Sequence, residues 1–202
     1  VLITGQAGTG KTYLLNKFIK YLKKNRVKVG ITASTGIAAT HLNGVTIHSW
    51  CGMGIKETIT NSDIKKMFSR NKNAIKRIQE ASVLIIDEVS MLHAYQLDMI
   101  DEICRRVRTD LGPFGGLQIV LCGDFFQLPP VSRTKGSGDF INLSNSWQQM
   151  DLNVCYLEKQ YRQNKDNALY RVLNEIRNSS VSDESIKLLN ERINYTFSEK
   201  IV

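Results

Sequence analysis

The stretch "GQAGTGKT", residues 5 to 12, matches the pattern G-x-x-x-x-G-K-[ST] and follows the apolar run "VLIT". Glycines allow unusual φ angles that turn backbone N–H groups inward, and a helix start adds its positive end, so this order of strand, turn and helix suits a phosphate. We predict that Lys11 reaches the β- and γ-phosphates of a nucleotide and that the Thr12 hydroxyl binds Mg²⁺. The residues predicted to bind nucleotide are Gly5, Gly8, Thr9, Gly10, Lys11 and Thr12. The alternative is a glycine-rich loop with an incidental lysine; a dinucleotide-binding G-x-G-x-x-G register is absent.

A second apolar run, "VLIIDEVSM" at 83 to 91, ends in two adjacent acids. Ligands of open α/β sheets gather at the carboxyl ends of the strands, where this run would deliver both side chains. We predict that Asp87 holds the Mg²⁺ shell and that Glu88 polarises an attacking water. An acidic cap to a following helix is the alternative.

Strand-like runs at 1–4, 27–32, 83–87, 117–123 and 153–158 alternate with helix-length amphipathic segments. Helices are predicted over 11–24, 36–43, 94–108, 166–178 and about 182–193, and two short basic helices within 56–80. Ser182 or Asp183 would cap the last helix, with Ile186, Leu189 and Ile193 facing inward. This alternation predicts an α/β fold with a parallel sheet covered by helices on both faces, in one domain.

The segment "GDFFQLPP" at 123 to 130 follows the run "LQIVLC" and is stiffened by two prolines. If this strand lies beside the one ending in Asp87, its exit loop reaches the same edge of the sheet. Gln127 would then place a neutral amide against the γ-phosphate. Alternatively, Gln127 caps a turn while Phe125 and Phe126 pack in a core.

Composition narrows the class of protein. The longest apolar runs are strand-sized and no charged-then-apolar leader opens the chain, so we expect a soluble, intracellular protein. The four cysteines, Cys51, Cys104, Cys122 and Cys155, form no C-x-x-C pair, which argues against a zinc site or a disulfide framework and favours small buried residues.

The net charge of +8 is unevenly distributed. Residues 1 to 80 carry 14 Lys plus Arg against 3 Asp plus Glu, whereas residues 81 to 140 carry 5 against 8. A nucleic acid is a reasonable partner for such a surplus, and a solvated helix face is the alternative.

Together, "GQAGTGKT", "TASTGIAA", "GVTIHSW", "LIIDEVSML", "CGDFFQLPPV" and "LEKQYRQ" followed by "LNEIR" resemble the Pif-type DNA helicases of superfamily one, relatives of RecD. The resemblance spans nearly the whole chain. It implies a RecA-like P-loop NTPase that uses ATP and Mg²⁺ to translocate 5′ to 3′ on single-stranded DNA and to unwind duplex or forked DNA, with roles in DNA repair and recombination. It also implies that Gln127 lies at the γ-phosphate and that Arg162, in "QYRQ", stabilises charge there.

The same resemblance makes Thr35, His48 and Ser49 candidates for contacts to the DNA backbone. A helix N-cap for Thr35 and a loop role for His48 are the alternatives, and Trp50 is expected in the core rather than stacked on a base. Residues 1–202 would form the first motor lobe, with a helical segment at 166–202, and the second motor lobe would be a partner lying outside this chain.

Two other functions stay open. A nucleotide phosphotransferase also uses a phosphate-binding loop but needs a lid and an acceptor pocket, and an ATPase switch or loader would not unwind DNA. The phosphotransferase has no evident use for "GDFFQLPPV" or "TIHSW", and the switch or loader would tolerate loss of Glu88.

Overall fold

The computed structural model describes residues 1–54, 58–131, 139–162 and 168–193. The chain divides into two compact units, Val1–Glu158 and Lys159–Val202. The strands are β1 (Leu2–Gly5), β2 (Val29–Ala33), β3 (Val45–Thr46), β4 (Val83–Asp87), β5 (Gln118–Gly123) and β6 (Val154–Leu157). The helices of the first unit are α1 (Lys11–Lys24), α2 (Gly36–His41), α3 (Ile47–Cys51), α4 (Asn61–Arg70), α5 (Lys72–Glu80), α6 (Ala94–Arg108) and α7 (Asn145–Gln149), with 3₁₀ turns η1 (Val89–Met91), η2 (Pro113–Gly116) and η3 (Ile141–Leu143).

Within the described residues, the strands form one sheet in the order β3-β2-β4-β5-β1-β6, and every neighbouring pair is parallel. The middle of this sheet is made of apolar runs without polar alternation, as strands covered on both faces require. All five residues of β4 are buried. The predicted parallel α/β sheet is therefore confirmed.

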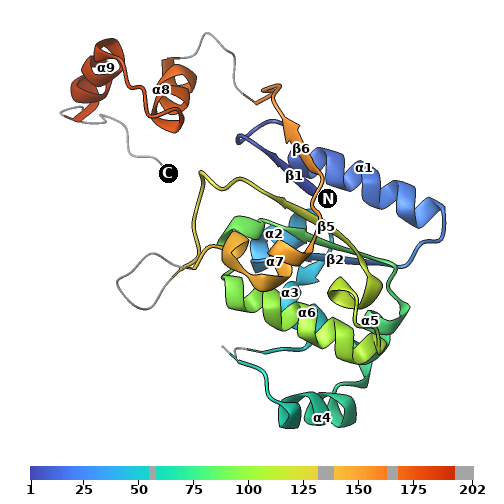
Figure 1. The fold of residues 1–202 in the computed structure, drawn as a ribbon. Coiled ribbons are helices and arrows are strands. Elements are labelled where there is room, and N and C mark those ends of the chain that lie inside the picture. Colours follow the sequence, from blue (N-terminus) through green and yellow to red (C-terminus); the bar gives the residue numbers. More distant parts are fainter. Residues whose placement is uncertain (55–57, 132–138, 163–167, 194–202) are drawn as a thin grey trace, which may run out of the picture. The chain divides into compact units, whose positions relative to one another are not determined.

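Successive side chains of each strand point to opposite faces, and helices cover both faces (Figure 1). On one face Ile3, Ile85 and Val120 pack with the apolar stripe of α1. On the other, Leu84 and Leu121 belong to the larger core that α3, α5 and α6 complete. Burial of these two layers is the main term that stabilises the first unit.

The carboxyl ends of the central strands meet at one edge of the sheet. The register pairs Ala33 of β2 with Asp87 of β4, and Ile86 with Leu121 of β5. Thr4 of β1 pairs with Gly123. The segments that leave β1, β2, β4 and β5 therefore begin side by side.

The helices and strands agree with the sequence-based expectations only in part. The helices predicted over 11–24 and 94–108 match α1 and α6, and 56–80 holds two short helices as expected. The short β3 and α3 were not predicted. Cys51, Cys104 and Cys122 are buried, but Cys155 is exposed because β6 is an edge strand, so its predicted burial is wrong.

The second unit contains α8 (Ala168–Arg177) and α9 (Asp183–Ile193). The predicted helix over 166–178 begins partly outside the described residues. Ser182 caps α9 as expected, since its Oγ accepts a hydrogen bond from the Ser185 N–H at 3.3 Å. The expectation that Ile186, Leu189 and Ile193 face inward is wrong, because all three side chains are exposed. None of the helices in the described part of the chain is both long and apolar enough to cross a membrane.

Candidate functional site

The loop between β1 and α1 has the backbone of a phosphate cradle. Gly5, Gly8 and Gly10 have φ angles of 148°, 82° and 89°, which L side chains rarely adopt. Space is also short, since a Cβ on Gly5 would lie 2.5 Å from the Leu157 carbonyl oxygen. Gly10 caps α1, whose first turn carries no acidic residue to oppose an anion. A phosphate group fits the backbone N–H groups of such a loop and helix start.

Lys11 is held over this loop by two hydrogen bonds. Its Nζ donates to the carbonyl oxygens of Gly5 at 2.8 Å and Gln6 at 2.9 Å. The buried Thr9 hydroxyl donates to the same Gln6 oxygen at 2.9 Å. Thr12 lies exposed in the first turn of α1. The six residues predicted to bind nucleotide thus form one continuous loop and helix start, with the ammonium group at its mouth.

Asp87 and Glu88 occupy the end of β4. The buried Asp87 carboxylate accepts a hydrogen bond from the Glu88 N–H at 2.9 Å. Burial raises the pKa of Asp87, opposed by hydrogen bonding from the Cys122 thiol, by the Glu88 N–H and by the Lys11 charge. In the strand order β4-β5-β1, Asp87 lies two strands from the phosphate loop, at the same edge of the sheet.

Glu88 has a strained backbone with φ 52° and ψ 43°, the left-handed region that a glutamate seldom adopts. Burial, followed by the Asp87 charge, raises the pKa of its carboxyl; Lys11 opposes the shift and Asp124 adds to it. A half-buried carboxyl with a raised pKa at the mouth of a phosphate loop has the properties of a general base.

The exit from β5 brings Gln127 to this edge, as the adjacency of β4 and β5 requires. Its Nε2 donates to Asp124 Oδ2 at 2.8 Å, and its backbone N–H donates to the Asp124 carbonyl at 3.0 Å. The turn-capping alternative is thus partly realised. Phe125 packs edge-on against Trp147, with ring centroids 5.8 Å apart, but Phe126 is 70% exposed, so the part of that alternative that placed both phenylalanines in a core is wrong.

Asp124 is the site residue that sequence reasoning missed. Its side chain is 1% exposed, it orients Gln127, and its charge acts on Glu88. The signal was available, since an acid directly after an apolar strand is the same pattern that singled out Asp87.

The predicted DNA contacts lie on segments that leave the neighbouring strands. Thr35 follows β2 and caps α2, its Oγ1 accepting from the Ala38 N–H at 3.3 Å. His48 and Ser49 lie on α3, where Ser49 is exposed and His48 is half-buried. Burial lowers the pKa of His48, which favours the neutral ring.

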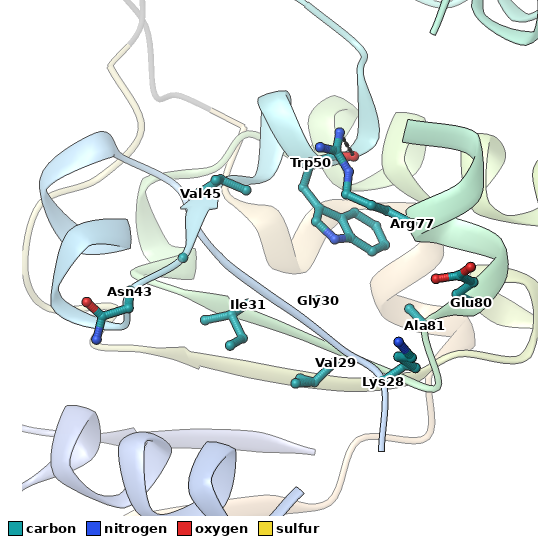
Figure 2. Close-up of a pocket in the computed structure, with 11 residues that line it drawn as sticks. Lys28, Val29, Gly30, Ile31, Asn43, Val45, Trp50, Arg77, Glu80 and Ala81 are labelled. Atoms are coloured by element: carbon teal, nitrogen blue, oxygen red, sulfur yellow. Dashed lines mark hydrogen bonds between the residues drawn. The ribbon is translucent and has the colours of Figure 1, made fainter. Parts of the chain in front are cut away.

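Trp50 belongs to the core, as expected. Its side chain is 4% exposed, and a Cβ on Gly30 would lie 2.8 Å from its ring. Figure 2 shows the indole flanking a shallow pocket beside β2, with the Arg77 guanidinium close by and bonded to the Trp50 carbonyl oxygen at 3.0 Å. Arg77 also donates to the Ser49 carbonyl at 2.9 Å, which ties α5 to α3.

Arg162 belongs to the second unit. Its backbone N–H donates to Gln160 Oε1 at 3.0 Å and its side chain is exposed. The predicted approach of this guanidinium to the γ-phosphate stays a prediction.

The glycine loop, the strand-end acids and the parallel sheet covered on both faces define a P-loop NTPase with a RecA-like sheet. The match to the family model described as PIF1-like helicase extends over residues 1–187. The chain belongs to the PIF1-like helicase family.

Relatives at the sequence level include the ATP-dependent DNA helicase Pif1 of Psychrobacter sp. (strain PRwf-1), 50% identical over 88% of this chain and 28% of the relative. The PIF1 helicase of Saccharomyces cerevisiae (strain YJM789) is 40% identical over 92% of this chain and 22% of its own length. The chain therefore spans about a quarter of these relatives.

Solved structures agree with the fold. The Pif1 helicase from Candida albicans superimposes with a TM-score of 0.85 at 39% identity, covering 93% of this chain and 42% of that one. A Bacteroides Pif1 in complex with ADP-AlF3 and ssDNA superimposes with a TM-score of 0.80 at 32% identity, covering 99% of this chain and 47% of that one.

Proposed function

We propose that this chain is the first motor lobe of an ATP-dependent DNA helicase, which hydrolyses Mg-ATP to translocate 5′ to 3′ on single-stranded DNA and unwinds duplex or forked DNA. The observation that carries the proposal is geometric: the phosphate loop after β1, the Asp87–Glu88 pair at the end of β4 and the Asp124–Gln127 turn after β5 lie at one edge of the sheet. The Bacteroides relative solved with ADP-AlF3 and ssDNA supports the use of both ligands.

Each side chain at this edge has a role in hydrolysis. Lys11 leaves the Gly5 and Gln6 carbonyls and binds the β- and γ-phosphates, which the loop N–H groups also hold. Glu88 takes a proton from the attacking water. The water oxygen bonds to the γ-phosphorus, the bond from that phosphorus to the β–γ bridging oxygen breaks, and ADP leaves with the electron pair.

Thr12 and Asp87 offer the oxygen ligands that Mg²⁺ prefers, one hydroxyl and one carboxylate beside the phosphate loop. When bound, the ion neutralises charge on the phosphate oxygens. Gln127 senses the γ-phosphate by exchanging its bond to Asp124, and Arg162 stabilises the developing charge.

Thr35, His48 and Ser49 contact the DNA backbone from the segments after β2 and β3. The second motor lobe, which accounts for part of the remaining length of the relatives, completes the nucleotide site and the DNA clamp. The protein works inside the cell, in the cytoplasm or nucleoid of a bacterium or in the nucleus or mitochondrion of a eukaryote.

Steady-state ATP hydrolysis by the full-length protein, with and without single-stranded DNA, tests the proposal. We expect strong stimulation by DNA and a loss of about 10²- to 10⁴-fold in Glu88→Gln, the range typical of a general base. Glu80→Gln, at an exposed glutamate on α5, is the matched control. Turnover that responds to a small acceptor instead of DNA indicates a phosphotransferase, and DNA binding with negligible turnover indicates a switch or loader; either result contradicts the proposal.

A further inference from the structure

Two residues at the start of α6 connect the Gln127 loop with the predicted DNA contact at His48. His93 caps α6, and its ring nitrogen Nε2 lies 3.2 Å from the Val131 carbonyl oxygen. A carbonyl oxygen only accepts, so Nε2 of His93 carries the proton. The His93 ring also stacks on Tyr95, with ring centroids 5.2 Å apart, which fixes its orientation.

Gln96 makes the second half of the connection. Its Oε1 accepts from the His93 backbone N–H at 2.9 Å, and its Nε2 lies 3.1 Å from Nε2 of His48. The backbone donor fixes which end of the amide is the oxygen, so the NH₂ group faces His48. An NH₂ group only donates; His48 Nε2 must therefore accept, and the proton of the neutral ring lies on Nδ1.

The segment between Gln127 and Val131 is suited to transmit a displacement. Pro129 and Pro130 restrict its φ angles, and Pro130 is buried. On the other side, Ala94 and Leu97 anchor the start of α6 in the core. A change in the Gln127–Asp124 contact is therefore carried along a stiff segment to His93 rather than absorbed.

We propose that His93 and Gln96 are positioning residues that couple the nucleotide site to DNA, through the series Val131 carbonyl, His93, Gln96 and His48, and that His48 contacts DNA as a neutral donor through Nδ1–H. The inference rests on the proposed function, because it needs His48 at the DNA and Gln127 at the γ-phosphate. It assigns roles to two residues outside the phosphate loop and the acid pair.

Two substitutions interrupt the series with little change in shape. Gln96→Glu keeps an oxygen for the His93 N–H but places an acceptor against His48, so that His48 Nε2 donates and the neutral ring no longer carries its proton on Nδ1. His93→Phe keeps an aromatic ring beside Tyr95 but loses both the donor to Val131 and the side-chain cap of α6. Gln79→Glu, at an exposed glutamine on α5, is the matched control for the added charge.

The test measures ATP hydrolysis by the full-length protein without DNA and at saturating single-stranded DNA. We expect DNA-free turnover within the range of the control in both variants and a Tm lowered only in His93→Phe, by the lost cap. Maximal stimulation should fall roughly tenfold in each variant, within the usual range of coupling between sites. The double variant should lose no more than either single one, because both interrupt one series. Additive losses, or full stimulation in either variant, overturn the proposal.

The charge state of His48 is tested separately through the salt dependence of DNA binding. A cationic phosphate contact contributes a slope of about 0.7 to log K against log salt on single strands. His48→Ala should weaken binding with the slope unchanged, and a slope reduced by about 0.7 overturns the neutral-donor assignment. If the unmodified protein shows no stimulation by DNA, the proposed function and the coupling both fail. If DNA stimulates the unmodified protein and both variants equally, the coupling alone fails.

Discussion

At the scale of single residues, the site contains two acidic side chains whose burial disfavours their charged form. Asp87 and Glu88 bring two carboxyls to a partly buried edge, and burial raises the pKa of both. The strained backbone of Glu88, with φ 52°, lies at the same position, where β4 ends. Such features cost stability and are typical of catalytic sites.

This cost should depend on pH. An acid whose pKa is raised by folding is ionised more readily in the unfolded chain, so stability falls as pH rises from the ordinary pKa to the folded one. The penalty is absent below the ordinary value of 4.5 for glutamate and complete above the raised value. We therefore expect Glu88→Gln to raise Tm at about pH 7.5 and to change it little at about pH 4.

Thermal unfolding followed by circular dichroism at the two pH values measures this difference, with Glu80→Gln as the exposed control. A Tm of Glu88→Gln that is lowered at neutral pH would show that the carboxylate stabilises the fold, contrary to this interpretation.

Strand-end acids and the glycine loop were predictable from the sequence because each is a short local pattern. The roles of Gln96 and His93 were not, because their partners His48 and Val131 lie far away in the sequence and only the folded chain brings them together. Gln96 and His48, for example, are 48 positions apart.

At the scale of elements, helix starts both stabilise the fold and present the predicted ligand contacts. Long amphipathic helices and buried strands were predictable because their periodicity extends over many residues. The two-residue strand β3 and the five-residue helix α3 carry too few residues for a period, so their presence follows from packing against β2 and α5. Exposure of Cys155 depends on the position of β6 at the sheet edge, which its composition does not encode.

The Thr35 cap gives one prediction at this scale. Thr35→Ala removes the acceptor for the Ala38 N–H and should lower the free energy of unfolding by about 1 kcal/mol, whereas Thr35→Ser should not. If Thr35 also contacts DNA, Ala weakens binding of a labelled single strand well below Tm, and Ser retains it. Equal DNA affinity in Thr35→Ala and the unmodified protein would leave Thr35 as a cap alone.

The Asp101–Arg105 pair gives a second prediction at this scale. The two carboxylate oxygens of the buried Asp101 accept hydrogen bonds from Arg105 Nε at 2.9 Å and 2.8 Å. One of them also accepts from the Ser146 hydroxyl at 3.1 Å, so Asp101 joins α6 to α7. Asp101→Ala leaves these donors without their carboxylate and should cost about 3–5 kcal/mol of unfolding free energy.

Glu102→Ala is the matched control one position away. It breaks the exposed pair with Arg106 and should cost roughly 0.2–1 kcal/mol. Urea unfolding measures both, and similar costs for the two variants would contradict the structural role given to Asp101.

At the scale of the whole molecule, the chain accounts for only part of the length of its relatives. It spans 28% of the Psychrobacter relative and 42% of the Candida structure. Arg162 illustrates the limit of sequence reasoning at this scale, because no local pattern around it predicts a phosphate contact.

We accordingly expect a polypeptide of residues 1–202 to show no strand displacement on a forked duplex under conditions in which the full-length protein unwinds it. The reason is that one lobe cannot alternate its grip on the strand. A fluorescence strand-displacement assay with both proteins at equal concentration measures this, and unwinding by residues 1–202 alone would remove the need for a second lobe.

The central claim is that Lys11, Thr12, Asp87, Glu88 and Gln127 surround one terminal phosphate. A crystal structure of the protein with Mg²⁺ and a non-hydrolysable ATP analogue tests it most directly. The account predicts Lys11 Nζ on the β- and γ-phosphates instead of the Gly5 and Gln6 carbonyls, and the Gln127 amide at the γ-phosphate instead of Asp124. A nucleotide bound elsewhere, or a γ-phosphate out of reach of both Glu88 and Gln127, would contradict it.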